Sequence, residues 1–291
     1  MPHTRKATPE LERSSTHGSY QNCYVAFLDV LGFRQLVDRS ADDAALLQRL
    51  SGITGMAAKP QSGIKETSLG PCPMQVRAFS DSFVVFTPVV KTAGDTVNRL
   101  AQLCFVVRYL HDRMLEMGAC IRGGIVEGKM FWRPSWSDTS PRPTGGLQDE
   151  PAITFGPGLN AAYDLESKQA IYPRVLVAHA LADKLRGDGT SAYPFASHGT
   201  SLHDSIRADA DDQMMHLDLL NARVVRHQGE AMRSSHGGFT VTWDTAAESA
   251  HHSIIDCVKK VAAQGMKADK ARGAVWQKYA WLATYCKACS A

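Results

Sequence analysis

The sequence predicts an α+β fold in which helices cover a mainly antiparallel sheet. Two apolar strand patterns that meet at a short polar turn, from Met74 to Pro88, predict an antiparallel hairpin. An amphipathic pattern from Asp95 to Gly118, with apolar residues every three or four positions, predicts a helix long enough to cross a whole sheet. The 291 residues, 44% of them hydrophobic, suffice for one large core or two small ones.

Composition narrows the classes of function. The formal net charge of +3 is too small to indicate nucleic acid or an anionic membrane as the main partner. No apolar run approaches the roughly 18 to 20 residues that span a bilayer. Residues 1–19 are polar, lack the apolar centre of a secretory signal and predict a disordered arm. Seven irregularly spaced cysteines favour reduced thiols, so we expect a cytoplasmic protein.

The first predicted strand lies within Tyr24–Phe33, which buries alternate apolar residues and leaves Asp29 at the rim of the sheet, before a Leu-Gly-Phe turn. Residues 34–55 show two helical stretches, with Ser40 as the expected cap of the second. A proline- and glycine-rich loop at 59–73 leads to the hairpin, and Asp81 lies in the hairpin turn. Each of these strands therefore ends beside a single acid.

The segment after the long helix is predicted to be a strand at 119–126 that continues as a hairpin at 129–132. Gly123 and Gly124 in this strand indicate close approach of another backbone or of a ligand. Residues 133–150 predict a mobile flap. Further elements are expected in the order strand, helix, strand and helix, at 153–155, 159–169, 175–178 and 179–185, and the turn Gly156-Pro157-Gly158 opens the first of these helices.

The last third of the chain is predicted to be an extension, at 206–291, that packs on a main domain at 20–205. Strands are expected within 215–225 and at 240–243, and helices at 245–263 and 270–285. Cys286 and Cys289 form a Cys-x-x-Cys pair with no second pair and no nearby histidine. An unstructured tail is favoured there over a zinc or redox site.

Asp29 and Asp81 are the candidates for chemistry. If their two strands are neighbours in one sheet, the carboxylates come within a few ångström of each other. Carboxylates and a backbone carbonyl of the turn, such as that of Val30, are the oxygen ligands that Mg²⁺ takes between protein and phosphate. Spacing alone favours the simpler alternative, in which each acid caps a turn.

The order of four motifs favours the metal site over the turn-capping alternative. They read FLDVLGF, FSDSFVVF, IRGGIVEG and FGPGLNAAYDLES, at 27–33, 79–86, 121–128 and 155–167. In order and spacing they resemble the class III nucleotide cyclase catalytic domain over residues 22–180. The resemblance implies a ferredoxin-like, palm-type fold, so residues 20–205 would be the catalytic domain.

The resemblance also implies roles for individual residues. Asp29 and Asp81, with Val30, would hold two divalent metal ions, Mg²⁺ or Mn²⁺. The backbone N–H groups of the turn after the first Asp would hold the triphosphate, as oriented amides suit anions. That turn and its flank are Val30, Leu31, Gly32 and Phe33, and the residue that steadies the ribose would be Asn160.

Three positions depart from the family pattern. The arginine that steadies the transition state is replaced by Asp164, so Arg122, Arg174 or a basic residue of the flap would have to serve. The lysine and aspartate that read adenine are replaced by Arg77 and Ile153. Because an apolar side chain cannot accept a hydrogen bond from the adenine amino group, the usual adenine recognition is lost.

This pattern resembles the pyrimidine cyclases of bacterial anti-phage systems, the Pycsar cyclases, which share the Leu-Gly-Phe turn. The implied product is a 3′,5′-cyclic pyrimidine nucleotide that a separate effector protein reads. Arg77 offers only donors, and uracil offers two carbonyl acceptors where cytosine keeps one, so UTP is favoured over CTP. The family places its active site between two domains, so a homodimer is expected.

Other functions stay open at this point. They are a nucleotide-binding pseudocyclase sensor, a purine cyclase acting on ATP or GTP, a palm-type enzyme that links nucleotides, and a purely structural protein. The linking enzymes usually carry an adjacent acid pair in the hairpin, and Ser80-Asp81-Ser82 has one acid.

Overall fold

The computed structural model describes residues 19–58, 74–89, 93–133, 153–187, 205–220, 243–268 and 273–290. Eight strands form one sheet in the order β2-β3-β1-β4-β6-β8-β7, and β5 pairs with β4 beside this path. All neighbours pair antiparallel except β4 and β6. The strands are β1 Gln21–Leu31, β2 Gln75–Phe79, β3 Ser82–Pro88, β4 Cys120–Arg133, β5 Ile153–Phe155, β6 Val175–Val177, β7 Ile206–Ala208 and β8 Met215–Leu217.

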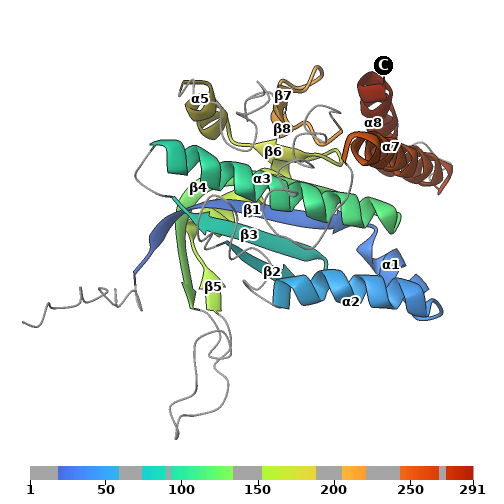
Figure 1. Cartoon of the computed structure of the whole chain (residues 1–291), viewed down its shortest axis with the longest axis horizontal. Coiled ribbons are helices and arrows are strands. Elements are labelled where there is room, and N and C mark those ends of the chain that lie inside the picture. Colours follow the sequence, from blue (N-terminus) through green and yellow to red (C-terminus); the bar gives the residue numbers. More distant parts are fainter. Residues whose placement is uncertain are drawn as a thin grey trace, which may run out of the picture.

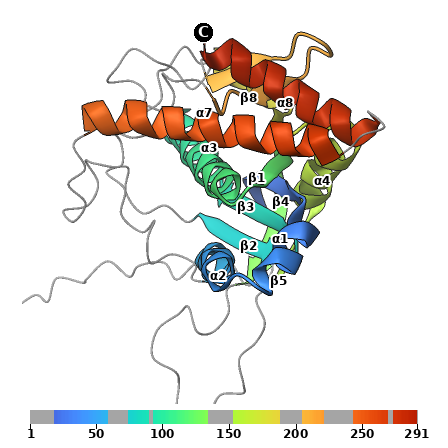
Figure 2. The ribbon, with the colours of Figure 1, turned by 90° about the vertical axis from the view of Figure 1, so that its right-hand side faces the viewer.

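Helices cover both faces of the sheet, which confirms the predicted α+β architecture. Helices α2 and α3 lie on one face and α4 on the other, as Figure 2 shows with α3 seen end-on. Helices α7 and α8 lie together at the upper right of Figure 1. The bounds are α1 Phe33–Ser40, α2 Ala44–Ala58, α3 Ala93–Glu116, α4 Pro157–Gln169, α5 His179–Gly187, α7 Trp243–Ala268 and α8 Ala274–Ser290.

Strand β1 separates two cores because successive side chains of a strand point to opposite faces. Tyr24, Ala26, Leu28 and Val30 pack in the core under α3. The intervening odd-numbered residues of β1, Cys23, Val25 and Phe27, pack in the core under α4. Asp29 continues this odd-numbered series, so its carboxylate lies on the face that α4 covers.

A third core joins the C-terminal helices to one end of the sheet. It contains Leu115 at the end of α3, Cys120 at the start of β4, and buried residues of α7 and α8 such as Val258 and Leu282. Leu31, at the end of β1, packs against the same cluster. The α7–α8 pair therefore covers the edge where β1 ends and β4 begins. The predicted division at 205/206 stays a prediction, although β7 and β8 belong to the same sheet as β1.

Several predicted boundaries were wrong, and each error has a local cause. Residues 120–133 form one continuous strand, β4, rather than a strand and a hairpin, since β1 and β5 pair with its successive parts. Helix α3 begins at Ala93, before the expected cap Asp95. Asp43 caps α2, because its carboxylate accepts the N–H of Leu46 at 2.9 Å, whereas the Ser40 hydroxyl donates to the Val37 carbonyl.

The extension also differs from its prediction. Trp243 is the first residue of α7 rather than the end of a strand. Cys286 and Cys289 lie in α8 rather than in an unstructured tail, and Cys286 is buried in the third core as a free thiol. Residues 206–208 form a strand, β7, that was not predicted.

Glycines at the crossing of β1, β4 and α4 act as predicted. A Cβ on Gly123 would lie 2.5 Å from the carbonyl oxygen of Phe27, and one on Gly124 would lie 2.7 Å from that of Ala162. Gly118 adopts a left-handed conformation with φ of +88° and ends α3, as predicted. The close backbone approach that these glycines indicated is confirmed.

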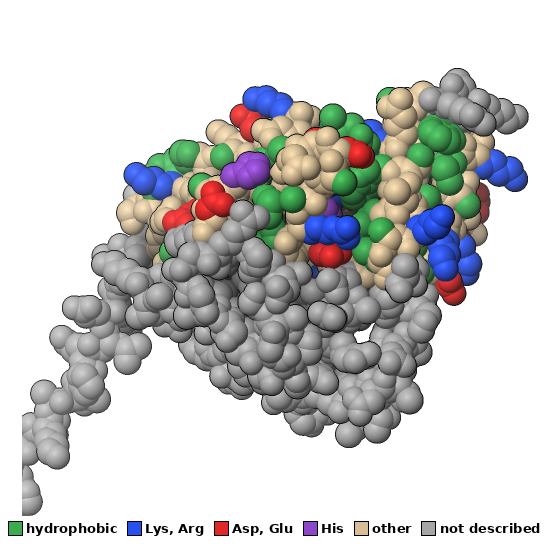
Figure 3. All heavy atoms as spheres, turned by 90° about the horizontal axis from the view of Figure 1, so that it is seen from above, with side chains coloured by type: hydrophobic (Ala, Val, Ile, Leu, Met, Phe, Trp, Pro, Cys, Tyr) green, Lys and Arg blue, Asp and Glu red, His purple; other side chains and the backbone are tan. Residues whose placement is uncertain are grey.

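Several predictions fall outside the described residues. They are the arm at 1–18, the loop at 59–73, the flap from residue 134 and the start of the 240–243 strand. No helix within the described ranges is long and apolar enough to cross a membrane. On the face in Figure 3, basic and acidic side chains are interspersed among hydrophobic ones.

Candidate active site

The structure brings the strand-end acids Asp29 and Asp81 to one place. Strand β1 pairs directly with β3, and Asp29 stands opposite Ser82, the residue after Asp81. The N–H of Val30 donates to the backbone oxygen of Asp81 at 2.9 Å. The hairpin turn is tight, with Ser80 at a φ of 53°. The two acids therefore come from adjoining backbones at one edge of the sheet, as the sequence predicted.

Helix α1 begins directly after this edge. Gly32 is its N-cap, with φ of 80°, and no side chain caps the helix. The first intrahelical bond runs from the N–H of Leu36 to the carbonyl of Gly32 at 3.1 Å. The N–H groups of the residues before Leu36 in this first turn therefore have no partner within the helix. The first turn also contains no acidic residue. Such a helix terminus favours an anion.

Arg122 on β4 lies between two carboxylates. It stands opposite Asp29 in the β1–β4 register, and its Nε donates to Oδ2 of Asp29 at 2.9 Å. The same Nε lies 2.7 Å from Oε1 of Glu166 on α4. A guanidinium Nε carries one hydrogen, so the contact with Glu166 is an ion pair and the hydrogen bond goes to Asp29.

Glu166 was not singled out in the sequence. Its side chain is 2% exposed, and burial is the main cause that raises its pKa above the ordinary value. The charge of Asp29 also raises this pKa, while Arg122 and Lys278 lower it. The signal for Glu166 was weak because a single acid in an amphipathic helix normally faces solvent.

The other candidates for the missing arginine lie elsewhere. Arg174 is 1% exposed, forms ion pairs with Asp209 and Asp212, and lies over the Tyr172 ring at 5.1 Å. This network holds Arg174 inside the protein. Asp164, at the position of the family arginine, forms an exposed ion pair with Lys168 at 3.0 Å. Of the two named arginines, Arg122 is therefore the one that contacts Asp29.

Asn160 lies on a different side of α4 from Glu166, the residue that contacts Arg122. It precedes Glu166 by six residues on α4, which places the two side chains about 120° apart around the helix. Glu166 is buried against β4, whereas Asn160 is exposed. Tyr163, one turn from Asn160, is also 51% exposed.

The two predicted base readers lie at different places. Arg77 on β2 pairs with Val84 on β3, and Val84 pairs with Phe27 on β1. Because Phe27 is two residues before Asp29, Arg77 lies on the same face of the sheet as Asp29, two residues further along the strands. This offset is about 7 Å along the strands and about 10 Å across the sheet. Ile153 pairs with Arg133, at the opposite end of β4 from Arg122. The described chain thus does not gather Arg77, Ile153, Asn160 and the acids around one point.

Lys278 on α8 is a further charged residue near this edge that sequence patterns did not indicate. Burial and the charge of Arg122 lower its pKa below the ordinary value, while Asp29 and Glu166 raise it. Nothing in the local pattern of α8 marks this lysine, because its neighbours at the edge are distant in sequence.

Comparisons with known proteins found structural neighbours only. Protein-family models gave no match, and curated protein sequences gave none either. The guanylyl cyclase domain of the RhoGC fusion protein from the aquatic fungus Blastocladiella emersonii is 16% identical with a TM-score of 0.35, over 58% of this chain and 85% of that chain.

Two further neighbours have similar values. The guanylate cyclase domain of RhGC from Catenaria anguillulae, solved in complex with GTP, is 16% identical with a TM-score of 0.35, over 68% of this chain and 94% of that chain. A class III adenylyl cyclase-like ATP-binding protein from Pseudomonas aeruginosa is 11% identical with a TM-score of 0.36. The match covers 62% of this chain and 39% of that chain. Because these TM-scores are below 0.5, we base the proposed function on this chain's own residues.

Proposed function

We propose that the chain is a pyrimidine nucleotide cyclase that converts UTP, and less readily CTP, to the 3′,5′-cyclic mononucleotide and pyrophosphate. The observation that carries this proposal is the meeting of Asp29, Asp81 and the uncapped start of α1 at one edge of the sheet. Two carboxylates beside an anion-binding helix terminus suit a metal-bound triphosphate.

The residues present fit divalent metal ions. The Asp29 side chain is 20% exposed at the edge of the sheet, and Asp81 is exposed in the hairpin turn. The described residues contain no group of three His, Cys, Asp or Glu placed to hold a metal, so phosphate oxygens, water and backbone oxygens such as that of Val30 would complete the shell. Bound Mg²⁺ or Mn²⁺ supplies a Lewis acid that activates the ribose 3′-hydroxyl and neutralises the leaving pyrophosphate.

The protein's own part is to bind and orient. The amides around Leu31, Gly32 and Phe33 would hold the triphosphate in line with the 3′-hydroxyl. Arg122, now bound to Asp29, would turn to a phosphate oxygen when the Asp29 carboxylate takes a metal. Arg122 would then serve in place of the family arginine that steadies the transition state, whose position Asp164 occupies.

The base preference rests on Arg77 and Ile153. The Arg77 guanidinium donates to the Val76 carbonyl and to the Gln75 side-chain oxygen, at 3.3 and 3.0 Å, so β2 holds it on the face of Asp29. A donor-only group suits the two carbonyls of uracil. The apolar Ile153 offers nothing to an adenine amino group.

A homodimer would complete the site. Asn160 is exposed on a different side of α4 from Glu166, so Asn160 of the partner subunit would face Asp29 and Asp81 across a twofold axis. Exposed Tyr163 beside Asn160 would lie at this interface. We further propose that the product serves as a signal in anti-phage defence, read by a separate effector protein.

Product formation from each of the four NTPs tests the proposal. With Mn²⁺ present, we expect a cyclic mononucleotide from UTP and a smaller amount from CTP, and no product after chelation of the metal. Chromatography with mass detection identifies the product. Formation of a product from ATP or GTP alone would exclude the pyrimidine assignment, and a linked dinucleotide would indicate a palm-type polymerising enzyme.

Substitution of the acids tests the metal assignment. Asp29→Asn and Asp81→Asn should each reduce turnover at least about 100-fold, since each removes a charged metal ligand. The thermal unfolding midpoint should change little, because both acids lie at a partly exposed edge. Asp256→Asn, at an exposed acid of α7, is the matched control, and its activity should stay near that of the wild type. Near-wild-type turnover by either active-site variant would refute the assignment.

A further inference from the structure

Helix α8 packs beside the row of side chains that carries the candidate active site. Leu31 and Cys120 pair across β1 and β4, and both lie against the third core with Tyr279 of α8. The next pair on the same face is Asp29 with Arg122. Because same-face neighbours on a strand are two residues apart, this pair lies about 7 Å further along the sheet.

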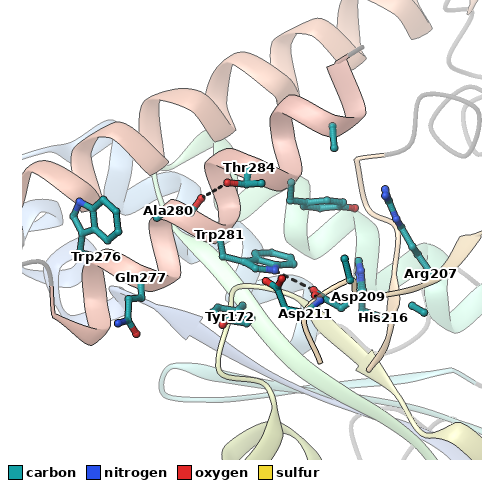
Figure 4. A pocket seen from close by; sticks show the side chains of 14 residues that line it. Tyr172, Arg207, Asp209, Asp211, His216, Trp276, Gln277, Ala280, Trp281 and Thr284 are labelled. Atoms are coloured by element: carbon teal, nitrogen blue, oxygen red, sulfur yellow. Dashed lines mark hydrogen bonds between the residues drawn. The ribbon is translucent and has the colours of Figure 1, made fainter. Parts of the chain in front are cut away.

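Specific contacts fix the rotation of α8. Tyr279 and Leu282 pack toward α7 in the third core. Trp281 faces the loop after α4: its ring stacks on Tyr172 at 5.3 Å, and its Nε1 donates to Oδ2 of Asp209 at 3.0 Å, as Figure 4 shows. Trp281, Tyr172 and Asp209 line a cavity of about 430 Å³ between α8 and the β7–β8 hairpin.

Lys278 lies one turn before Trp281 on the same side of α8, because residues three apart are neighbours on a helix surface. It is half-buried, and it interacts electrostatically with Asp29, Arg122 and Glu166. Arg122 contacts both carboxylates, and the packing of α8 on the third core places Lys278 near these three residues, so charged side chains from β1, β4, α4 and α8 lie at this edge. Their two carboxylates and two cations balance when all four are ionised.

This balance has a consequence for a polyanionic ligand. Arg122 is already shared by Asp29 and Glu166, at 2.9 and 2.7 Å. Without Lys278 the cluster would carry a net negative charge, which repels phosphate. The lysine is the second cation of the cluster and stands beside the metal-binding edge.

We propose that Lys278 is a phosphate-binding residue of the active site, which pairs with the triphosphate of the bound nucleotide together with Arg122. Helix α8 is then a part of the active site rather than an appendage. The inference rests on the proposed function in placing a triphosphate beside Asp29.

Inorganic tripolyphosphate with Mg²⁺ tests this inference without a base and without turnover. Isothermal titration calorimetry on the full chain should show binding to the wild type and about tenfold weaker binding to Lys278→Met, as expected for loss of one charge-assisted contact. Lys278→Arg should bind within about threefold of the wild type, because the positive charge remains. The matched control is Lys287→Met, at an exposed position on the same helix, which should bind as the wild type does.

Activity provides a second readout. Lys278→Met should raise KM for UTP about tenfold while its thermal unfolding midpoint stays near that of the wild type. Equal tripolyphosphate binding by Lys278→Met and the wild type, or no binding by the wild type, would overturn the inference. If tripolyphosphate binding depends on Lys278 but no NTP yields a cyclic product, the inference stands and the proposed cyclase activity fails.

Discussion

At the scale of single residues, Glu166 is the most unusual group near the candidate site. It is almost fully buried, its Oε1 accepts no hydrogen bond from a described residue, and its charge is offset by the neighbouring Arg122. A buried carboxylate is costly unless it is paired and hydrogen-bonded. Glu166 therefore holds Arg122 beside Asp29 at a cost in stability.

This cost predicts a dependence on pH. Since burial raises the pKa of Glu166, the native state keeps this proton to a higher pH than the unfolded chain does. The free energy of unfolding should fall as pH rises from the unfolded pKa through the raised one, by at most about 1.4 kcal/mol per pH unit. Glu166→Gln should remove this loss, so its stability relative to the wild type should increase with pH. Denaturant unfolding at several pH values measures the effect, and parallel profiles for the two proteins would contradict it.

At the scale of elements, the crossing of α4 and β4 sets the position of Glu166. Gly128 on β4 and Gly158 on α4 touch through their backbones, since a Cβ on Gly128 would lie 2.6 Å from the Cα of Gly158. Only glycine at both positions allows this approach. The crossing in turn brings the later turns of α4 over Arg122.

A pair of glycine substitutions tests the crossing. Gly128→Ala should lower the free energy of unfolding by about 1–3 kcal/mol, because the added methyl group forces two backbones apart. It should also lower activity by displacing Glu166 and Arg122. Gly52→Ala, in α2 where a Cβ meets nothing within 4 Å, should instead stabilise the protein by about 0.5–1 kcal/mol. Thermal and denaturant unfolding measure the free energy of unfolding of both variants. If Gly128→Ala changed this free energy no differently from Gly52→Ala, the close approach of α4 and β4 would not be needed for stability.

At the scale of the whole molecule, Asp29 lies near the end of β1 and Asn160 lies exposed in the first turn of α4. A composite site between two copies predicts that two inactive variants restore each other. In a mixture of Asp29→Asn and Asn160→Ala chains, each heterodimer has one site with both native residues. With random pairing, about a quarter of the wild-type activity should return.

The measurement is the rate of UTP cyclisation after mixing and subunit exchange at equal concentrations. Each variant alone is the control and should stay inactive. Failure of the mixture to recover activity, while size measurements show heterodimers, would place both residues in one chain's site.

Much of the fold could be predicted because its signals are local. Short apolar runs that end at turns marked β1 and β3, and three- and four-residue spacing marked α3. The three-residue strands β7 and β8 are too short to show a period, so β7 was missed and β8 was only bracketed. Trp243 and the cysteine pair were misassigned because α7 and α8 gain their stability from packing on the third core.

By itself, the sequence predicted a kind of chemistry, from two strand-end acids, from a glycine turn between β1 and α1, and from the order of four motifs. Only the tertiary structure decided which charged groups accompany them. The β1–β4 register and the glycine crossing of α4 bring Arg122 and Glu166 together, and the docking of α8 places Lys278 near them. These are contacts between residues distant along the chain, which local periodicity and spacing do not encode.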